Sequence, residues 1–164
     1  MSHTTRGLLI LAAMLTLGMA PAFGAEPAHE HGGHGGATLK LNNGQKWKTD
    51  APLLQGMASI KAAVQPHLHA IHGNTLKAAN YQALAKRTHT QIAFIVKNCK
   101  LAPEADAQLH LVIAELGAAA DAMAGKDKAQ SRQQGALQLV HALETYGEFF
   151  DHPGWSLAAT GHAH

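Results

Sequence analysis

The chain has 164 residues, with 13 Lys and Arg against 11 Asp and Glu, 13 His and a single cysteine. The charge is nearly balanced, and the basic residues form no stripe interleaved with aromatics, which argues against a nucleic-acid-binding protein. Without the expected leader about 140 residues remain, which is the length of one domain and enough to bury a core without disulfides.

Residues 1–25 have the pattern of a secretion signal. Arg6 supplies the positive charge, residues 7–20 are apolar, and residues 22–24 offer small side chains two apart for cleavage. The apolar run is too short for a membrane span, and Pro21 follows it at once. We therefore expect export to the periplasm and a mature protein that does not span the membrane; an uncleaved anchor is the alternative.

Histidine-rich segments flank the expected domain. Residues 26–37 contain His29, His31 and His34 among glycines and lack core-forming side chains, so we expect them to be flexible. Residues 158–164 form a similar tail. Imidazoles on a flexible chain bind Cu(II), Ni(II) or Zn(II), which makes these three histidines secondary metal ligands. Solvated ends without a metal role are the alternative.

Residues 38–47 alternate around Asn43-Gly44, a dipeptide that favours a two-residue hairpin turn. We expect a short N-terminal hairpin or an extended arm there. The first helix is expected over about residues 51–72, because Asp50 can cap it. Its apolar residues recur at spacings of four and three, on one helix face: Leu53, Met57, Ile60, Val64, Leu68 and Ile71.

Three more amphipathic helices follow, over about residues 75–99, 103–124 and 129–150. The four helices have about 20–25 residues each and short connections, which is the pattern of a four-helix bundle. We therefore predict an all-α fold, an antiparallel up-down-up-down four-helix bundle over residues 38–157.

This order of helices brings four helix ends together at one end of the bundle. Cys99 lies there, with Met57 and His110 about 9–10 Å further in and His152 just past the last helix. Thiolate, thioether and imidazole are together the ligands that a soft metal ion such as copper prefers. We therefore expect a copper site built from Cys99, Met57 and either His152 or His110, in a protein that handles or senses metal.

Each of these residues also has a purely structural interpretation. Met57 lies on an apolar seam, where methionine commonly fills the core, and His152 can cap the fourth helix. His110 flanks the apolar face and can simply be half-exposed. Cys99 can be a small buried side chain, or it can form a disulfide with a second copy and make a homodimer.

A second histidine pair is expected at the opposite end of the bundle. His69 and His72 are three apart on one helix face, which predicts a weak secondary metal site; an exposed basic helix end is the alternative. The chain has no Cys-x-x-Cys-His motif, no pair of Glu-x-x-His motifs and no glycine-rich phosphate loop. We therefore expect no enzyme activity and no catalytic residue.

Three motifs stand out near the end that is expected to carry Cys99: Asn98-Cys99-Lys100-Leu101, Leu109-His110 and Phe150-Asp151-His152-Pro153-Gly154-Trp155. They resemble motifs of a small family of exported bacterial four-helix bundles. The resemblance covers most of residues 38–157, and it implies a periplasmic bundle without implying a particular chemistry.

A looser resemblance is to the soluble four-helix haem proteins. In these a methionine early in the first helix and a histidine late in the fourth bind a b-type haem, and Met57 and His152 hold similar positions here. The attachment motif of c-type haem is absent, and His152 lies beyond the expected helix. The resemblance implies non-covalent haem b as the alternative cofactor. A ligand-free bundle that binds a periplasmic protein partner through one helix face is the third interpretation.

Overall fold

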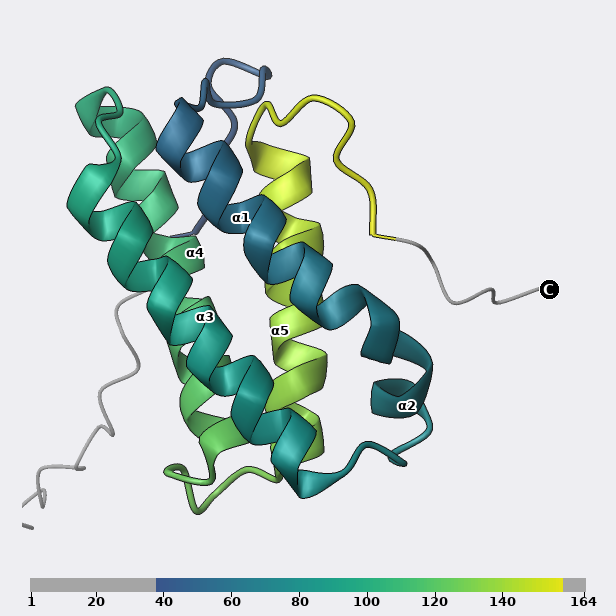
Figure 1. Cartoon of the computed structure of the whole chain (residues 1–164). Helices are drawn as coiled ribbons and strands as arrows, with labels where there is room; N and C mark the ends of the chain where they lie inside the picture. The colour runs from purple at the N-terminus through teal and green to yellow at the C-terminus, as the bar shows by residue number, and fades with distance from the viewer. Residues whose placement is uncertain (1–37, 158–164) are drawn as a thin grey trace, which may run out of the picture. The chain divides into compact units, whose positions relative to one another are not determined.

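The computed structural model describes residues 38–157. The expected signal peptide, the segment with His29, His31 and His34, and the tail from residue 158 lie outside them. The described part is helical, without strands, and its helices are α1 (Ala51–Val64), α2 (Leu68–His72), α3 (Ala78–Asn98), α4 (Pro103–Ala124) and α5 (Arg132–Phe149) (Figure 1). The predicted all-α class is confirmed, and the long helices are compatible with a helical bundle.

The helix expected over residues 51–72 is interrupted at Pro66. A 3₁₀ turn over Gln65–His67 separates α1 from the short α2. Proline has no N–H to donate, and its ring meets the carbonyl one turn earlier, so a regular helix does not pass through it unbroken. The apolar seam continues nevertheless, because Leu68 and Ile71 of α2 are buried in the core.

The starts of α1 and α3 follow local signals. Asp50 caps α1, and its Oδ1 accepts the Leu53 N–H at 2.9 Å. α3 begins at Ala78, later than the expected residue 75. The delay comes from Asn74, with a left-handed φ of 52°, and from Lys77, which is extended with ψ of 149°. The chain becomes helical only after Lys77, because Asn74 and Lys77 have non-helical backbone angles.

α5 begins at Arg132 rather than near residue 129. Ser131 Oγ accepts the Gln134 N–H at 3.1 Å, and Gln134 Oε1 accepts the Ser131 N–H at 2.7 Å. This reciprocal pair is a capping box. Gly125 closes α4 with a left-handed φ of 78°, which glycine adopts without strain. The α4–α5 connection is therefore closed by local contacts.

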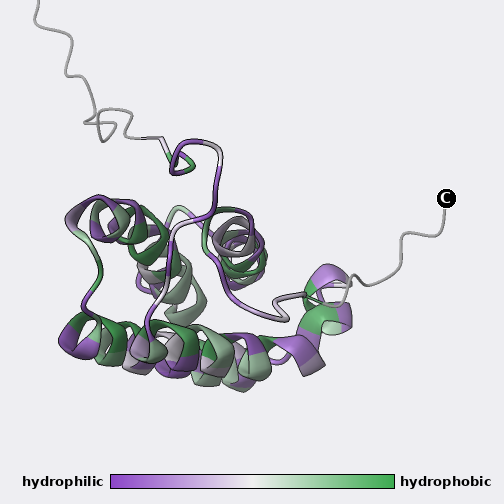
Figure 2. Cartoon of the chain, turned by 90° about the horizontal axis from the view of Figure 1, so that it is seen from above, coloured by the Kyte–Doolittle hydropathy of each residue, from purple (hydrophilic) through white to green (hydrophobic). Residues whose placement is uncertain are grey.

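α1 and α3 lie side by side in one layer, and α4 and α5 form the layer behind it (Figure 1). Viewed from above, hydrophobic residues gather where the helices face one another (Figure 2). The largest fully buried side chains are Tyr146, Phe150, Leu53, Met57, Ile60, Ile71, Ile95, Leu109, Leu116, Met123, Leu139 and Leu143. Burial of such side chains stabilises a fold by roughly 1.5–3 kcal/mol each before entropy is counted, so this core is the main stabilising element.

α4 and α5 come very close together at Gly135. A Cβ at this position would lie 2.7 Å from Ala122 Cβ and 2.8 Å from both Ala119 O and Met123 N. Backbone atoms inside a packed layer cannot move away from such a contact cheaply. The spacing of the two helices therefore depends on the missing side chain.

Residues 46–49 lie against the end of α5. The Trp47 N–H donates to Phe149 O at 2.8 Å, and the Asp151 N–H donates to Trp47 O at 2.8 Å. We call this pairing of residues 46–49 with residues 149–151 the clasp. It fixes the chain that enters the bundle to the chain that leaves the last helix.

Asn43 and Gly44 form a tight turn before the clasp, with φ of 50° and 82°. These are the left-handed conformations of the type I′ turn that Asn-Gly favours. An isolated bridge between Asn42 and Gln45 closes the turn. In the described residues the pairing does not extend beyond this one bridge.

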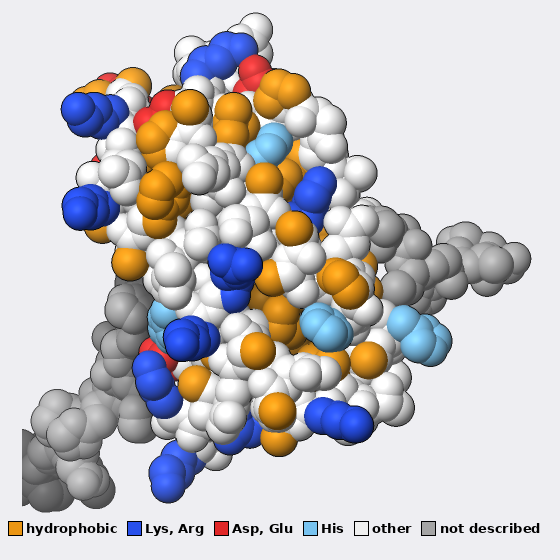
Figure 3. All heavy atoms as spheres, viewed as in Figure 1, with side chains coloured by type: hydrophobic (Ala, Val, Ile, Leu, Met, Phe, Trp, Pro, Cys, Tyr) orange, Lys and Arg blue, Asp and Glu red, His pale blue; other side chains and the backbone are white. Residues whose placement is uncertain are grey.

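Charge is divided between the two halves of the described chain. From Ala51 to Pro103 there are five Lys and one Arg but no Asp or Glu, whereas from Glu104 to Leu157 there are eight Asp and Glu and three Lys and Arg. On the side of α1 and α3, Lys and Arg spread over the surface and acidic side chains are few (Figure 3). None of the described helices is long and apolar enough to cross a membrane.

Candidate functional site

Cys99 directly follows the last residue of α3 and is half-buried. Its Sγ donates to Asp50 Oδ1 at 3.2 Å, and the Lys100 N–H donates to Asp50 Oδ2 at 2.6 Å. Because Asp50 also caps α1, one carboxylate ties the start of α1 to the end of α3. The sequence indicates Asp50 as a helix cap, but not as this bridge.

The thiol of Cys99 is protonated at neutral pH. Burial, and then the Asp50 carboxylate, raise the pKa of Cys99 to about 12, because both oppose a new negative charge. Burial acts to raise the pKa of Asp50 as well, but hydrogen bonds from Lys100, Leu53 and Cys99 outweigh it and lower that pKa. A thiolate here therefore needs a cation to replace the proton, and a bound metal ion would serve.

Cys99 lines a cavity of about 160 Å³ between the end of α3 and the first half of α4. Asp106 and His110, one helical turn apart on α4, line the same cavity, together with the apolar Val96 and Ile113. His110 Nδ1 lies 2.9 Å from Asp106 O and 3.4 Å from Asp106 Oδ2. The structure thus brings together two of the predicted ligands, a thiol and an imidazole, with a carboxylate beside them.

In residues 38–157 no three His, Cys, Asp or Glu side chains are grouped closely enough to hold a metal ion. His110 is exposed, however, and its ring is hydrogen-bonded only within its own helix, to Asp106 O. Rotation of the ring toward Cys99 would therefore disturb little packing.

Met57 and His152 do not line that cavity. Met57 is fully buried in the core. His152 Nδ1 is hydrogen-bonded to the Tyr146 hydroxyl at 3.0 Å, and its ring centroid lies 4.6 Å from that of Trp155. Burial, and then Lys61, lower the pKa of His152. Two of the four predicted primary ligands are therefore engaged in core and aromatic contacts.

The segment after α5 folds back along the helix and creates the surroundings of His152. Trp155 Nε1 donates to Leu143 O at 3.1 Å, and the indole covers Gly147, where any Cβ would collide with it. Lys61 Nζ lies 4.8 Å from the centroid of the Trp155 ring, a cation–π distance. Pro153 and Gly154 form the turn of this return, with Gly154 at a left-handed φ of 70° and the Trp155 N–H donating to His152 O at 3.1 Å. Gly147 leaves room for the indole.

His69 and His72 lie exposed on α2. His72 Nδ1 is 2.7 Å from Leu68 O, so one of its ring nitrogens is used within the helix. The described surroundings supply no third His, Cys, Asp or Glu. A secondary metal site at this pair stays a prediction.

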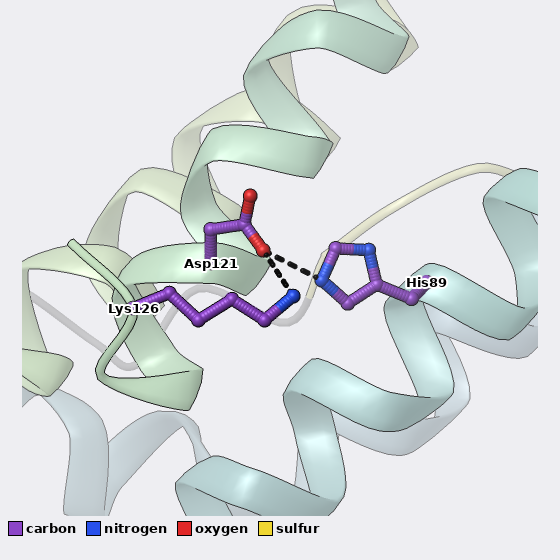
Figure 4. A network of polar contacts seen from close by, with 3 residues as sticks. All are labelled: His89, Asp121 and Lys126. Atoms are coloured by element: carbon purple, nitrogen blue, oxygen red, sulfur yellow. Dashed lines mark hydrogen bonds and ion pairs between the residues drawn. The ribbon is translucent and has the colours of Figure 1, made fainter.

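One histidine contact was not predicted. His89 Nε2 on α3 lies 3.1 Å from Asp121 Oδ1 on α4, and Lys126 Nζ lies 2.9 Å from the same oxygen (Figure 4). Lys126, and to a smaller extent His89, lower the pKa of Asp121. All three side chains are partly exposed, so the network joins two helices at the surface with little energy. Only the alignment of α3 against α4 would reveal it from the sequence.

A second cavity, of about 370 Å³, lies between the clasp and the α3–α4 connection. Its lining includes Trp47 and four charged residues, Lys48, Asp50, Lys100 and Glu104. These carry both signs of charge, Asp50 already accepts three hydrogen bonds, and Lys48 is paired with an aspartate. The cavity has no single charge preference that would indicate a ligand.

No protein-family model, curated protein or solved structure matches this chain. The resemblances that its motifs suggest stay predictions. The function is therefore inferred from the chemistry of the residues themselves.

Proposed function

We propose that this chain is a periplasmic copper-binding protein, folded as an antiparallel up-down-up-down bundle with a short N-terminal arm, and that Cys99 and His110 are its primary ligands. One observation supports this choice of ligands: the thiol and the imidazole line the same cavity. A thiolate suits Cu(I) and other soft ions, and imidazole is a good copper ligand. Copper also ranks highest among the divalent first-row metals in its affinity for such sites.

Binding exchanges a proton for a metal ion. Cys99 gives up its S–H proton and its hydrogen bond to Asp50, and the sulfur becomes a thiolate ligand. His110 binds only as the neutral imidazole, and the neighbouring Asp106 can orient its ring. Because protons compete with the metal at both ligands, copper affinity should fall as the pH is lowered.

The histidine-rich segment has a separate role in this proposal, which is to capture copper. His29, His31 and His34 would bind Cu(II), and this affinity should fall below about pH 6, where imidazole becomes protonated. Deletion of residues 26–36 should remove the weaker Cu(II) binding and leave the Cu(I) binding that depends on Cys99. Equal loss of both would show that the two sites are one.

The test of the primary site is Cu(I) affinity, measured by competition with a chromophoric chelator under reducing conditions. We expect Cys99→Ala and His110→Ala each to lose at least about ten-fold in affinity, or about 1.4 kcal/mol. His141→Ala is the matched control, because His141 is also exposed and lines a different cavity. Circular dichroism checks that each variant is folded. Affinity that is unchanged in Cys99→Ala would refute the site.

The other interpretations stay predictions. No contact of Met57 or His152 favours haem b over copper, and an absorption spectrum after haemin addition tests it. A Soret band that disappears in Met57→Ala and His152→Ala would replace copper by haem. A non-reducing gel tests the homodimer linked through Cys99. A ligand-free bundle that binds a protein partner would take up no metal at all.

A further inference from the structure

The face formed by α1 and α3 carries positive charge without counter-charge. The basic residues of the stretch from Ala51 to Pro103 are Lys61, Lys77, Lys86, Arg87, Lys97 and Lys100. None of them takes part in the ion pairs found in the described part of the chain. All except Lys61 are exposed. Lys61 is engaged by the Trp155 ring and by Ser156 O, to which its Nζ donates at 3.2 Å. The five exposed cations are free to attract an external anion.

Three of these cations, Lys86, Arg87 and Lys97, lie on α3 and are exposed. Lys86 and Lys97 are three helical turns apart and so lie on the same side of the helix. Thr90 and Ala93, which lie between them on that side, are exposed and small. α3 has 21 residues, a length of about 30 Å, and it lies beside α1 in one layer (Figure 1). The result is a long face with protruding lysines.

The side chains of this face are unlike those at the centre of a protein–protein interface. Such centres favour aromatic residues and Arg and disfavour Lys. No Trp, Tyr or Phe of α3 is exposed. Val96, at 59% exposure, is the only large apolar side chain described as exposed on these helices. Mobile lysines without apolar anchors instead suit the diffuse negative charge of lipid phosphates.

We infer that the α1–α3 face is a docking surface for a membrane rich in anionic phospholipid, with Lys86, Lys97 and the neighbouring cations facing the phosphate headgroups. Charge complementarity holds the protein there, and no segment of the face enters the hydrocarbon. The acidic half of the chain, from Glu104 onward, supplies α4 and α5, the layer behind this face (Figure 1). This docking goes beyond copper binding and does not depend on it.

Vesicle binding tests the inference. The full chain is sedimented with phosphatidylcholine vesicles and with vesicles that contain about 30% phosphatidylglycerol, at ionic strengths of about 0.02 M and 0.5 M. We expect at least about ten-fold tighter binding to the anionic vesicles at low salt, and loss of this preference at high salt. The neutral vesicles measure any binding that does not depend on lipid charge. No preference for anionic vesicles would overturn the inference.

A pair of variants with equal change in charge locates the surface. Lys86→Gln/Lys97→Gln should lose about ten-fold of the binding to anionic vesicles. Lys40→Gln/Lys128→Gln, at exposed sites outside α1 and α3, should lose less than about two-fold, because these lysines stay far from the headgroups. Equal losses would mean that only net charge matters and would overturn the inference. Salt-sensitive binding to polyglutamate with none to vesicles would assign the face to an acidic protein instead.

Discussion

At one end of the molecule, main-chain pairing and a carboxylate bridge join segments far apart in the chain. At the other end the caps of α4 and α5 are local, and distant segments meet through single side-chain contacts, such as that of Gln133 Nε2 with Ile71 O at 3.1 Å. The first end carries the clasp and the bridge from Asp50 to Cys99 and Lys100. The second carries the α4–α5 connection, closed by Gly125 and by the capping box of Ser131. The structure of the first end therefore depends more on the packing of distant segments than that of the second.

This difference explains where the chemistry gathers. The capping groups of Ser131 and Gln134 are satisfied within α5, so they offer little to a ligand. Where separate segments converge, the same groups must find partners across elements, as Asp50 does with the Cys99 thiol. The cavity shared by Cys99 and His110 lies at this kind of junction. Long-range contacts therefore stabilise this end and hold one of its candidate ligands, Cys99.

Removal of the aromatic centre at the clasp end should have the largest effect. Tyr146 is fully buried and its ring stacks on Phe150 at 5.2 Å between centroids. Tyr146→Ala should lower the free energy of unfolding by about 3–5 kcal/mol. Tyr146→Phe removes only the hydrogen bond to His152 and should cost about 1 kcal/mol. Urea unfolding measures both, and a cost below about 1 kcal/mol for the alanine variant would contradict the importance of this cluster.

The two helix caps offer a direct comparison of the ends. Ser131→Ala removes a local cap and should cost about 1 kcal/mol. Asp50→Ala removes a cap and also leaves the Lys100 N–H and the Cys99 thiol without their acceptor, so it should cost about 2–3 kcal/mol. Denaturant titration of both variants supplies the comparison. Equal costs would mean that the bridge adds nothing to the cap.

The pH dependence of stability should reveal His152. Its pKa is lowered in the fold, by burial and then by Lys61, so folding favours the neutral ring. This contribution is complete above the ordinary value of about 6.5 and is lost as the pH falls through the lowered pKa. Between about pH 7.5 and 5.5, the Tm of the wild type should fall more than that of His152→Gln. If Tm fell with pH equally in the wild type and in His152→Gln, His152 would be excluded as the cause of this pH dependence.

The surface network of His89, Asp121 and Lys126 should have the smallest effect. Its groups are partly exposed, so solvent and salt screen their attraction. His89→Ala should change the free energy of unfolding by less than about 0.5 kcal/mol, because Lys126 still pairs with Asp121. A thermal melt at low and high salt measures it. A loss above about 1.5 kcal/mol would show a role that these contacts do not explain.

The periodicity of the sequence predicts the helices well, but not every break in them. Apolar spacing places α4 over the residues that it occupies, because burial of one face and the Gly125 stop agree. The break at Pro66 was missed, since the apolar seam continues through it into Leu68 and Ile71. The late start of α3 depends on the left-handed Asn74, a backbone choice that spacing does not report.

The candidate site was predictable only in part. The sequence places Cys99 at a helix end, where the structure finds it half-buried. Its partner Asp50 lies in another segment, and the pair is recognised only once the helices are packed together. Met57 occupies a seam position that fits a ligand and a core side chain equally well, and it is fully buried. The partner of His152 depends on the return of the chain past α5 toward Tyr146, which no periodic pattern encodes.

X-ray absorption spectroscopy of the Cu(I)-loaded protein tests the central claim most directly, because it identifies the atoms bound to the metal. The proposal predicts one sulfur and one imidazole nitrogen in the copper shell of the wild type. The imidazole signal should disappear in His110→Ala, and the sulfur signal in Cys99→Ala, while His141→Ala retains both. A copper shell without sulfur, or one that is the same in Cys99→Ala and the wild type, would contradict the account.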